Sequence, residues 1–216
     1  MNRSLAVILI SMLALCASAA AQDKTSASQK AAEKIPVSYG LVVDNSGSFR
    51  PLLDKVIAVV SDVVEENAAE DEAFLVTFVN TQKIVLRQEF TYRKSELHDA
   101  AQNMFIEGGQ TAILDAVKSA ADYLAKNARS DGDRVRALVL VTDGEDRESV
   151  SKIEDVLKLL KENNIRVFVI AMADGKVFTK LLDRLTKETG GIMLMPKNRT
   201  EMAAAARQVA SATRTR

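Results

Sequence analysis

Residues 37–48 read VSYGLVVDNSGS, an apolar run that passes directly into a loop carrying hydroxyl groups. The run Val37–Val43 shows no strict alternation of apolar and polar side chains, which is typical of a strand covered on both faces, as in a parallel sheet. Three later runs share this character: Phe74–Val79, Ala137–Val141 and Val167–Met172. We therefore expect four buried, mostly parallel strands.

Helical patterns separate these strands. Apolar residues recur at i, i+3, i+4 and i+7 over residues 52–64, 113–124 and 153–160. Further helices are expected over Lys94–Phe105 and Lys176–Thr189, and a terminal helix runs from Arg199 to about Ser211. The sequence Ser151-Lys152-Ile153-Glu154 predicts a capping box at the start of one helix.

Two further strands complete the expected sheet. The run Lys83–Phe90 follows Phe74–Val79 after a three-residue link, which indicates a hairpin and an antiparallel edge strand. A last strand is expected near Ile192–Met195. Strands that alternate with helices predict a doubly wound α/β fold, with a mostly parallel six-stranded sheet and helices on both faces.

Composition excludes several classes of function. The chain has 216 residues, with 29 basic and 29 acidic side chains, one Cys and one His. Zero net charge removes the electrostatic pattern of a general nucleic-acid binder, so we expect no nucleic-acid partner. One Cys and one His exclude a thiolate or multi-imidazole zinc site and an intrachain disulfide. Any metal site must therefore be built from oxygen.

The N-terminus predicts export. Residues 1–21 read MNRSLAVILISMLALCASAAA, the pattern of a secretory signal peptide cleaved after Ala21. The apolar run is too short to span a bilayer, so no transmembrane segment should remain after cleavage. We expect a polar tether at 22–34, one domain at 35–216, and a secreted or periplasmic location. A lipoprotein anchored at Cys16 is the alternative.

Polar side chains directly follow two of the expected buried strands, at the sheet edge where a binding site is expected. Asp44 and Asp143 each follow such a strand, and carboxyl ends of parallel strands meet at one sheet edge. Nearby loops supply the hydroxyls of Ser46, Ser48 and Thr111. This is a hard oxygen set, which selects Mg²⁺, with Mn²⁺ or Ca²⁺ as alternatives. Each motif alone also fits a helix cap or a turn.

The order of these motifs resembles a known family. Asp44-Asn45-Ser46-Gly47-Ser48 resembles the Asp-x-Ser-x-Ser motif of von Willebrand factor type A (VWA) domains. Gly109-Gln110-Thr111 is similar to the family's Thr loop, and Thr142-Asp143-Gly144 to its Thr-Asp-Gly strand end. The resemblance spans about residues 36–211. The layout of a leader followed by one such domain is similar to small secreted bacterial members.

The resemblance implies a Rossmann-like sheet with a metal-ion-dependent adhesion site that holds a divalent ion, usually Mg²⁺. Ser46, Ser48 and Thr111 would supply hydroxyl oxygens, and Asp44 and Asp143 would act directly or through water. The open coordination position would accept an Asp or Glu carboxylate from a partner protein. Such domains bind rather than catalyse, so the resemblance implies no enzyme activity and no catalytic residues.

Two alternative functions remain open at this point. One is a metal-dependent phosphohydrolase with Asp44 as its nucleophile. Acidic enzymes of the haloacid dehalogenase type need an Asp-x-Asp pair, and Ser46 occupies the second position here. The other alternative is a structural VWA module that keeps the motif without using its ion.

Overall fold

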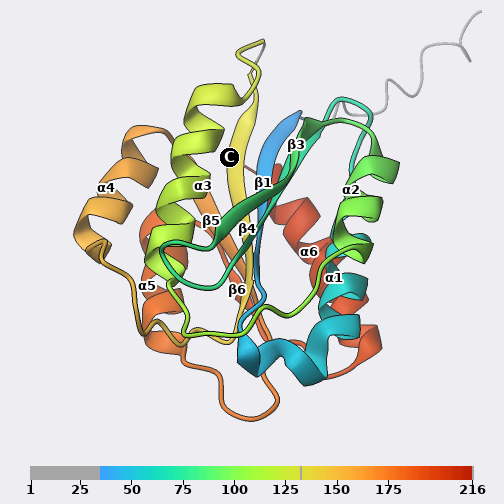
Figure 1. Ribbon diagram of the computed structural model, residues 1–216. Helices are drawn as coiled ribbons and strands as arrows, with labels where there is room; N and C mark the ends of the chain where they lie inside the picture. Colours follow the sequence, from blue (N-terminus) through green and yellow to red (C-terminus); the bar gives the residue numbers. More distant parts are fainter. Residues whose placement is uncertain (1–34, 132, 216) are drawn as a thin grey trace, which may run out of the picture. The chain divides into compact units, whose positions relative to one another are not determined.

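The computed structural model describes residues 35–131 and 133–215; the expected signal peptide, Cys16 and the tether lie outside this part. Here six strands form one sheet in the order β3-β2-β1-β4-β5-β6 (Figure 1). Their bounds are β1 Val37–Asp44, β2 Glu72–Phe78, β3 Ile84–Thr91, β4 Val135–Thr142, β5 Ile165–Ala171 and β6 Met193–Leu194.

The pairing confirms the predicted fold class. Strand β1 lies between β2 and β4 and runs parallel to both, and β5 and β6 continue the parallel sheet. Strand β3 is the antiparallel edge and pairs with β2. Two backbone hydrogen bonds close the hairpin, from Val79 N to Lys83 O (2.9 Å) and from Lys83 N to Asn80 O (3.0 Å).

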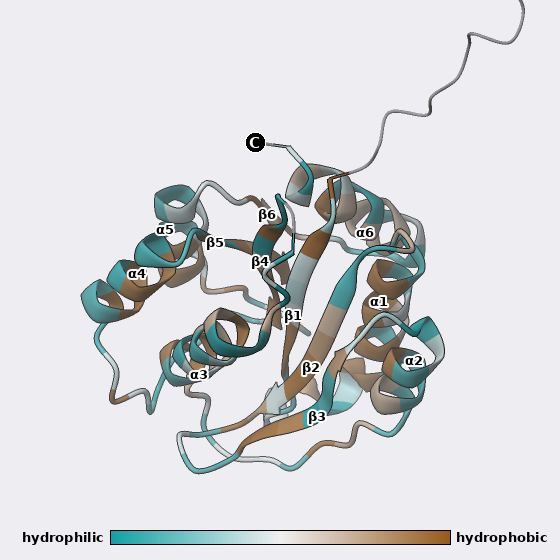
Figure 2. Cartoon of the chain, turned by 90° about the horizontal axis from the view of Figure 1, so that it is seen from above, coloured by the Kyte–Doolittle hydropathy of each residue, from teal (hydrophilic) through white to brown (hydrophobic). Residues whose placement is uncertain are grey.

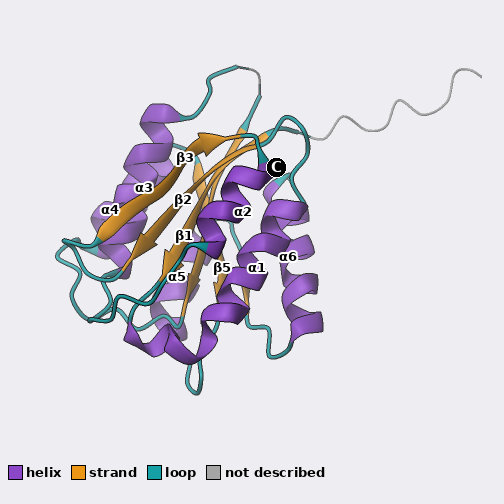
Figure 3. Ribbon diagram, turned by 45° about the vertical axis from the view of Figure 1, so that its right-hand side comes forward, coloured by secondary structure: helices purple, strands orange, loops and turns teal. Residues whose placement is uncertain are grey.

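Helices cover both faces of the sheet (Figures 2 and 3). One layer and its core cluster contain α1, α2 and α6, and the other contains α3, α4 and α5. The bounds are α1 Leu53–Glu65, α2 Lys94–Gln102, α3 Ile113–Asn127, α4 Ile153–Glu162, α5 Thr179–Thr189 and α6 Arg199–Thr213. A 3-10 helix, η1, precedes α1 at Gly47–Leu52.

Strand β1 is buried along its whole length. Leu41 and Val43 pack into the core on the α1 side, whereas Val42 packs into the core on the α3 side. Full burial of one such side chain contributes roughly 1.5–3 kcal/mol. Packing on both faces therefore holds β1 in one register, and this register positions the residues that follow it.

The glycine in β1 makes room for an aromatic cluster. A Cβ at Gly40 would lie 2.3 Å from Cζ of Phe74, which is fully buried on β2. The Phe74 ring packs against Phe90 (4.9 Å between centroids) and Tyr123 (4.8 Å). The close approach of the ring to the β1 backbone thus requires glycine at this position.

Some element ends differ from those expected. Helix α2 ends before residue 105, because the Asn45 amide donates to Phe105 O (3.1 Å) and holds that residue in the following loop. Helix α5 starts three residues later than expected, since Phe178 N is engaged by Asp143 O (2.8 Å). The predicted capping box is wrong. The N-cap of α4 is Lys152, and Ser151 N donates to Asp115 instead.

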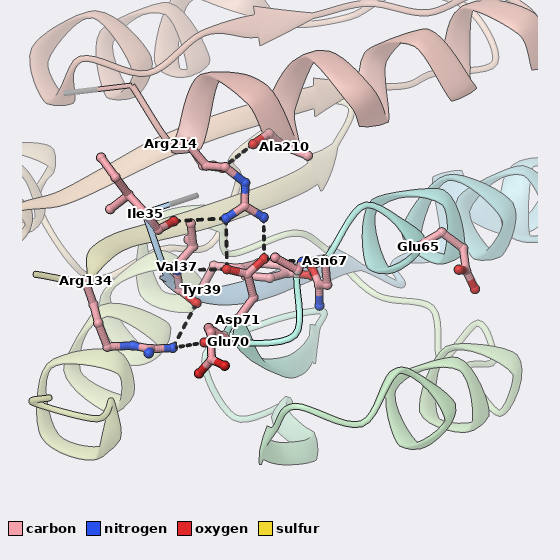
Figure 4. A network of polar contacts seen from close by, with 12 residues as sticks. Ile35, Val37, Tyr39, Glu65, Asn67, Glu70, Asp71, Arg134, Ala210 and Arg214 are labelled. Atoms are coloured by element: carbon pink, nitrogen blue, oxygen red, sulfur yellow. Dashed lines mark hydrogen bonds and ion pairs between the residues drawn. The ribbon is translucent and has the colours of Figure 1, made fainter. Parts of the chain in front are cut away.

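A buried ion pair joins the end of α6 to Asp71, the residue before β2, and hydrogen bonds extend it to the start of β1 (Figure 4). The Arg214 guanidinium binds both carboxylate oxygens of Asp71 and donates to Ile35 O. Asp71 also accepts hydrogen bonds from Val37 N (2.9 Å) and Ala68 N (2.7 Å). The Asp71 carboxylate therefore joins three segments that are distant in sequence, and its side chain is only 1% exposed.

We expect Arg214→Gln to lower the free energy of unfolding by about 3 kcal/mol, because it leaves the Asp71 carboxylate buried without its cation. Arg199→Gln is the matched control on the same helix. Its ion pair with Asp62 is exposed at the arginine (60%), so the expected loss is below about 1 kcal/mol. Urea unfolding of both variants measures the difference, and equal losses would contradict this account.

Candidate metal centre

The candidate centre lies where β1 and β4 end, at the lower edge of the sheet in Figure 1. The two strands are parallel neighbours, with Val43 opposite Val141. Asp44 is the last residue of β1, and Asp143 directly follows β4. The strand register thus brings the two predicted carboxylates to one edge, as the sequence indicated.

Asp44 is a buried carboxylate with polar neighbours. Its side chain accepts hydrogen bonds from Ser46 N (3.0 Å) and from the hydroxyl of Thr142 (2.8 Å), and the residue is 1% exposed. Burial raises the pKa of Asp44 to about 6, and the charge of Asp143 adds to this effect. The hydrogen bonds from Ser46 and Thr142 act in the opposite direction and do not compensate fully.

The two predicted serines lie beside Asp44. Their hydroxyl oxygens are 3.2 Å apart, with Ser46 buried and Ser48 exposed. Ser46 is the N-cap of η1, yet its side chain makes no capping hydrogen bond. Helix capping therefore does not account for the Ser46 hydroxyl, which leaves its oxygen next to the Asp44 carboxylate.

The loop that carries Thr111 is tied to both other loops of the site. Glu107 N donates to Asn45 O (3.1 Å), and Thr111 O accepts from Arg147 N (2.8 Å) and Glu148 N (3.1 Å). Gly109 has φ +114°, and a Cβ there would lie 2.7 Å from Val79. Glycine at this position therefore lets the loop pass close to the end of β2, where Thr111 is buried.

Asp143 is held by the turn that follows it. Its carboxylate accepts from Glu145 N (3.0 Å), and Gly144 N donates to the Thr142 hydroxyl (3.2 Å). Gly144 has φ +85°, and a Cβ there would lie 2.1 Å from Phe178 O. The Thr-Asp-Gly sequence is therefore needed for local geometry as well as for its carboxylate.

All five predicted residues lie on three loops at this edge. Hydrogen bonds link Asp44, Ser46 and Ser48, the charge of Asp143 acts on Asp44, and Thr111 bonds to the loop after Asp143. In the described part of the chain, no three His, Cys, Asp or Glu side chains are grouped to hold a metal ion. An ion bound here would depend on hydroxyl oxygens together with the two carboxylates.

The sequence alone did not reveal a polar network beside the site. The Asn45 amide donates to Glu107 Oε1 (3.3 Å), which also accepts from Arg87 on the edge strand β3 (2.6 Å). The Oδ1 atom of Asn45 is buried without a hydrogen-bond partner in the described structure. Asn45 lies within the sequence motif, but its contacts depend on the β2–β3 pairing and on loops about 60 residues away.

Two acidic residues also have structural roles that the sequence did not show. Asp146 accepts from Ile113 N (3.1 Å) and so caps α3 from another loop. Asp115 accepts from Val150 N (3.0 Å) and Ser151 N (2.8 Å). Burial alone would raise the pKa of Asp115, but its hydrogen bonds hold this pKa below its ordinary value. Together these carboxylates fasten the loop after β4 to the start of α3.

The fold and this site define a class of protein: a doubly wound α/β module with two carboxylates and three hydroxyls at the carboxyl edge of its sheet. The von Willebrand factor type A domain matches residues 40–208, which include all three loops. The chain belongs to this family of protein-interaction modules, as its motifs indicated. A comparison with curated proteins found no match.

Solved structures share the fold. BatB from Bacteroides thetaiotaomicron has a TM-score of 0.68 at 16% identity, covering 83% of this chain and 100% of that one. An aerotolerance-related membrane protein from Bacteroides fragilis has a TM-score of 0.66 at 19% identity, covering 81% and 98%. A VWA protein from Catenulispora acidiphila has a TM-score of 0.70 at 13% identity, covering 82% and 42%. None of the helices in the described ranges is long and apolar enough to cross a membrane.

Without metal, Asp44→Asn should stabilise the protein at neutral pH. The pKa of this carboxyl rises from 3.8 to about 6 on folding, so stability is lost as pH rises through this interval. In EDTA we expect the variant to exceed wild type by up to about 3 kcal/mol at pH 7.5, and by little near pH 4. Urea unfolding across this range tests the sign. The exposed Asp174→Asn is the control, and a difference independent of pH would contradict the account.

Proposed function

We propose that this chain is a secreted or periplasmic module that binds a protein ligand through a Mg²⁺-dependent adhesion site. Asp44, Ser46, Ser48, Thr111 and Asp143 would hold the ion, with Mn²⁺ or Ca²⁺ as alternatives. When bound, the ion supplies positive charge and an open coordination position for an Asp or Glu carboxylate of the partner. Export would follow cleavage after Ala21, with lipidation at Cys16 as the alternative.

The electrostatics of Asp44 are the observation that carries this proposal. Its carboxylate is buried beside a second carboxylate, and neither forms an ion pair with a basic side chain in the described structure. Buried charges in proteins are normally paired or coordinate metals. A dication bound by the two aspartates and the adjacent hydroxyls would supply the missing positive charge, and its hard character suits an all-oxygen set.

Exposed apolar side chains around the site support a protein ligand. Phe105, Val150 and Phe178 are exposed, and each belongs to a loop that is bonded to a site loop or to Asp115 at the start of α3. Asn45 donates to Phe105 O, Phe178 N donates to Asp143 O, and Val150 N donates to Asp115. Apolar contacts surrounding a carboxylate-accepting ion are suited to a protein surface that presents an acidic residue among apolar ones.

The alternatives receive less support. A phosphohydrolase of the haloacid dehalogenase type needs its acid/base carboxylate two residues after the nucleophile, and that residue is Ser46, whose hydroxyl lies against Ser48. A structural module that leaves its ion unused would retain the buried, uncompensated Asp44 without benefit. Metal binding and metal-dependent capture of a partner distinguish these functions from the proposed one.

Isothermal titration with Mg²⁺ tests the site directly. We expect wild-type protein to bind one ion and Asp143→Ala to bind none, because half of the carboxylate charge is lost while the sheet stays packed. Circular dichroism checks the fold of each variant. Asp174→Asn removes an exposed carboxylate that follows β5 at the same sheet edge, and it should bind Mg²⁺ like wild type. Undiminished affinity in Asp143→Ala would refute the site assignment.

Capture of envelope proteins on the immobilised chain tests the function. A partner retained in Mg²⁺ should be released by EDTA and should not bind Asp143→Ala. Val150→Lys should weaken retention without changing Mg²⁺ affinity, because Val150 is exposed and contributes only its backbone to the site. Retention that is insensitive to EDTA would instead favour a structural module, and metal-dependent phosphatase turnover would favour the enzyme.

A further inference from the structure

An open cavity of about 800 Å³ lies at the edge of the sheet opposite the candidate metal centre. Its walls include Val135 and Ile165, the first residues of β4 and β5. The opposite ends of these two strands lie at the edge that carries the candidate metal centre. The last turn of α4 and residues 188–189 of α5 also line it. This volume falls within the range of small-molecule binding sites.

The cavity is strongly basic. Its lining contains five cationic side chains and two acidic ones: Arg129, Arg134, Arg136, Lys161 and Arg166 against Asp133 and Glu188. The chain as a whole has no net charge. Asp131 forms ion pairs with Arg129 and Arg134, and Glu188 with Lys161. The positive charge left at this cavity is therefore mainly that of Arg136 and Arg166, and a concave surface strengthens its attraction for anions.

Part of this charge has a structural role. Arg166 donates to Thr213 O in the last turn of α6, and cations stabilise helix C-termini. Arg134 donates to the Ser38 hydroxyl (2.9 Å) and to Glu70 O (2.5 Å). Lys161 pairs with Glu188. Contacts with a helix end, with neighbouring oxygens and with an acidic side chain thus account for the presence of Arg166, Arg134 and Lys161 at this edge.

No such contact within the described structure accounts for the guanidinium of Arg136. It is the second residue of β4, it is half-buried, and within the described structure its guanidinium makes no hydrogen bond or ion pair. A guanidinium carries five N–H donors, and leaving them unpaired in a half-buried place is unfavourable. Arg166, on the neighbouring strand β5, also lacks a carboxylate partner, and burial lowers its pKa. Two arginines without carboxylate partners therefore line one cavity.

We propose that this cavity is a binding site for a phosphate ester, with Arg136 as its principal contact. The planar guanidinium matches a phosphate group with two parallel hydrogen bonds. The cavity is larger than one phosphate, so it also accommodates the polar group esterified to it. The ester is either a soluble metabolite or a phospholipid headgroup. This site is independent of the proposed metal-dependent function.

Titration calorimetry with glycerol 3-phosphate tests the site, with EDTA present so that no metal ion contributes. We expect Arg136→Gln to weaken binding by at least about tenfold, the effect of losing a charge-assisted bidentate contact. Arg50→Gln is the matched control, since it removes the same charge from an exposed residue of η1. Equal affinity of the two variants, or no binding by wild type at 10 mM ligand, overturns the proposal.

Two further measurements keep the test decisive. If Arg136→Gln does not fold, Arg136→Lys retains the charge without the planar fork and should still bind more weakly than wild type. Co-sedimentation with phosphatidylglycerol vesicles, compared with phosphatidylcholine alone, identifies the source of the phosphate. Binding to the anionic vesicles that depends on Arg136 indicates a headgroup, whereas binding to glycerol 3-phosphate alone indicates a soluble ester.

Discussion

Burial of β1 on both faces is the constraint on which the rest of the structure depends. Because Leu41 and Val43 pack on one side and Val42 on the other, the strand has one register relative to β2 and β4. That register places Asp44 beside the Thr142 hydroxyl and near Asp143. The consequence is a carboxylate that is only 1% exposed and whose pKa is raised by burial.

The two edges of the sheet differ in their electrostatics. At the carboxyl edge, neither Asp44 nor Asp143 forms an ion pair among the described residues, and the Ser46 and Thr142 hydroxyls lie against Asp44. At the opposite edge, helix C-termini meet arginines, and Asp71 is fully paired with Arg214. The proposed cation site and the proposed anion site therefore lie at opposite edges of one sheet.

The candidate site is also more connected than its five predicted residues indicate. Glu107 joins the loop after Asp44 to Arg87 on the edge strand. Asp146 and Asp115 hold the loop after β4 against the start of α3. The arrangement of the site thus depends on residues that supply no oxygen to it, which is how metal-binding side chains are commonly kept in place.

The sequence by itself determined the sheet, its antiparallel edge and the shared edge of Asp44 and Asp143, because apolar runs and strand ends are local signals. It also predicted a role for Thr111 from the glycine-bearing loop before an amphipathic helix, and the structure ties this loop to the loop after Asp143. Only the tertiary structure decided the contacts of Asn45 with Glu107 and of Asp71 with Arg214, and the cavity around Arg136. The two contacts join residues 62 and 143 positions apart, and separate segments of the chain line the cavity, so none of them leaves a periodic or local pattern in the sequence.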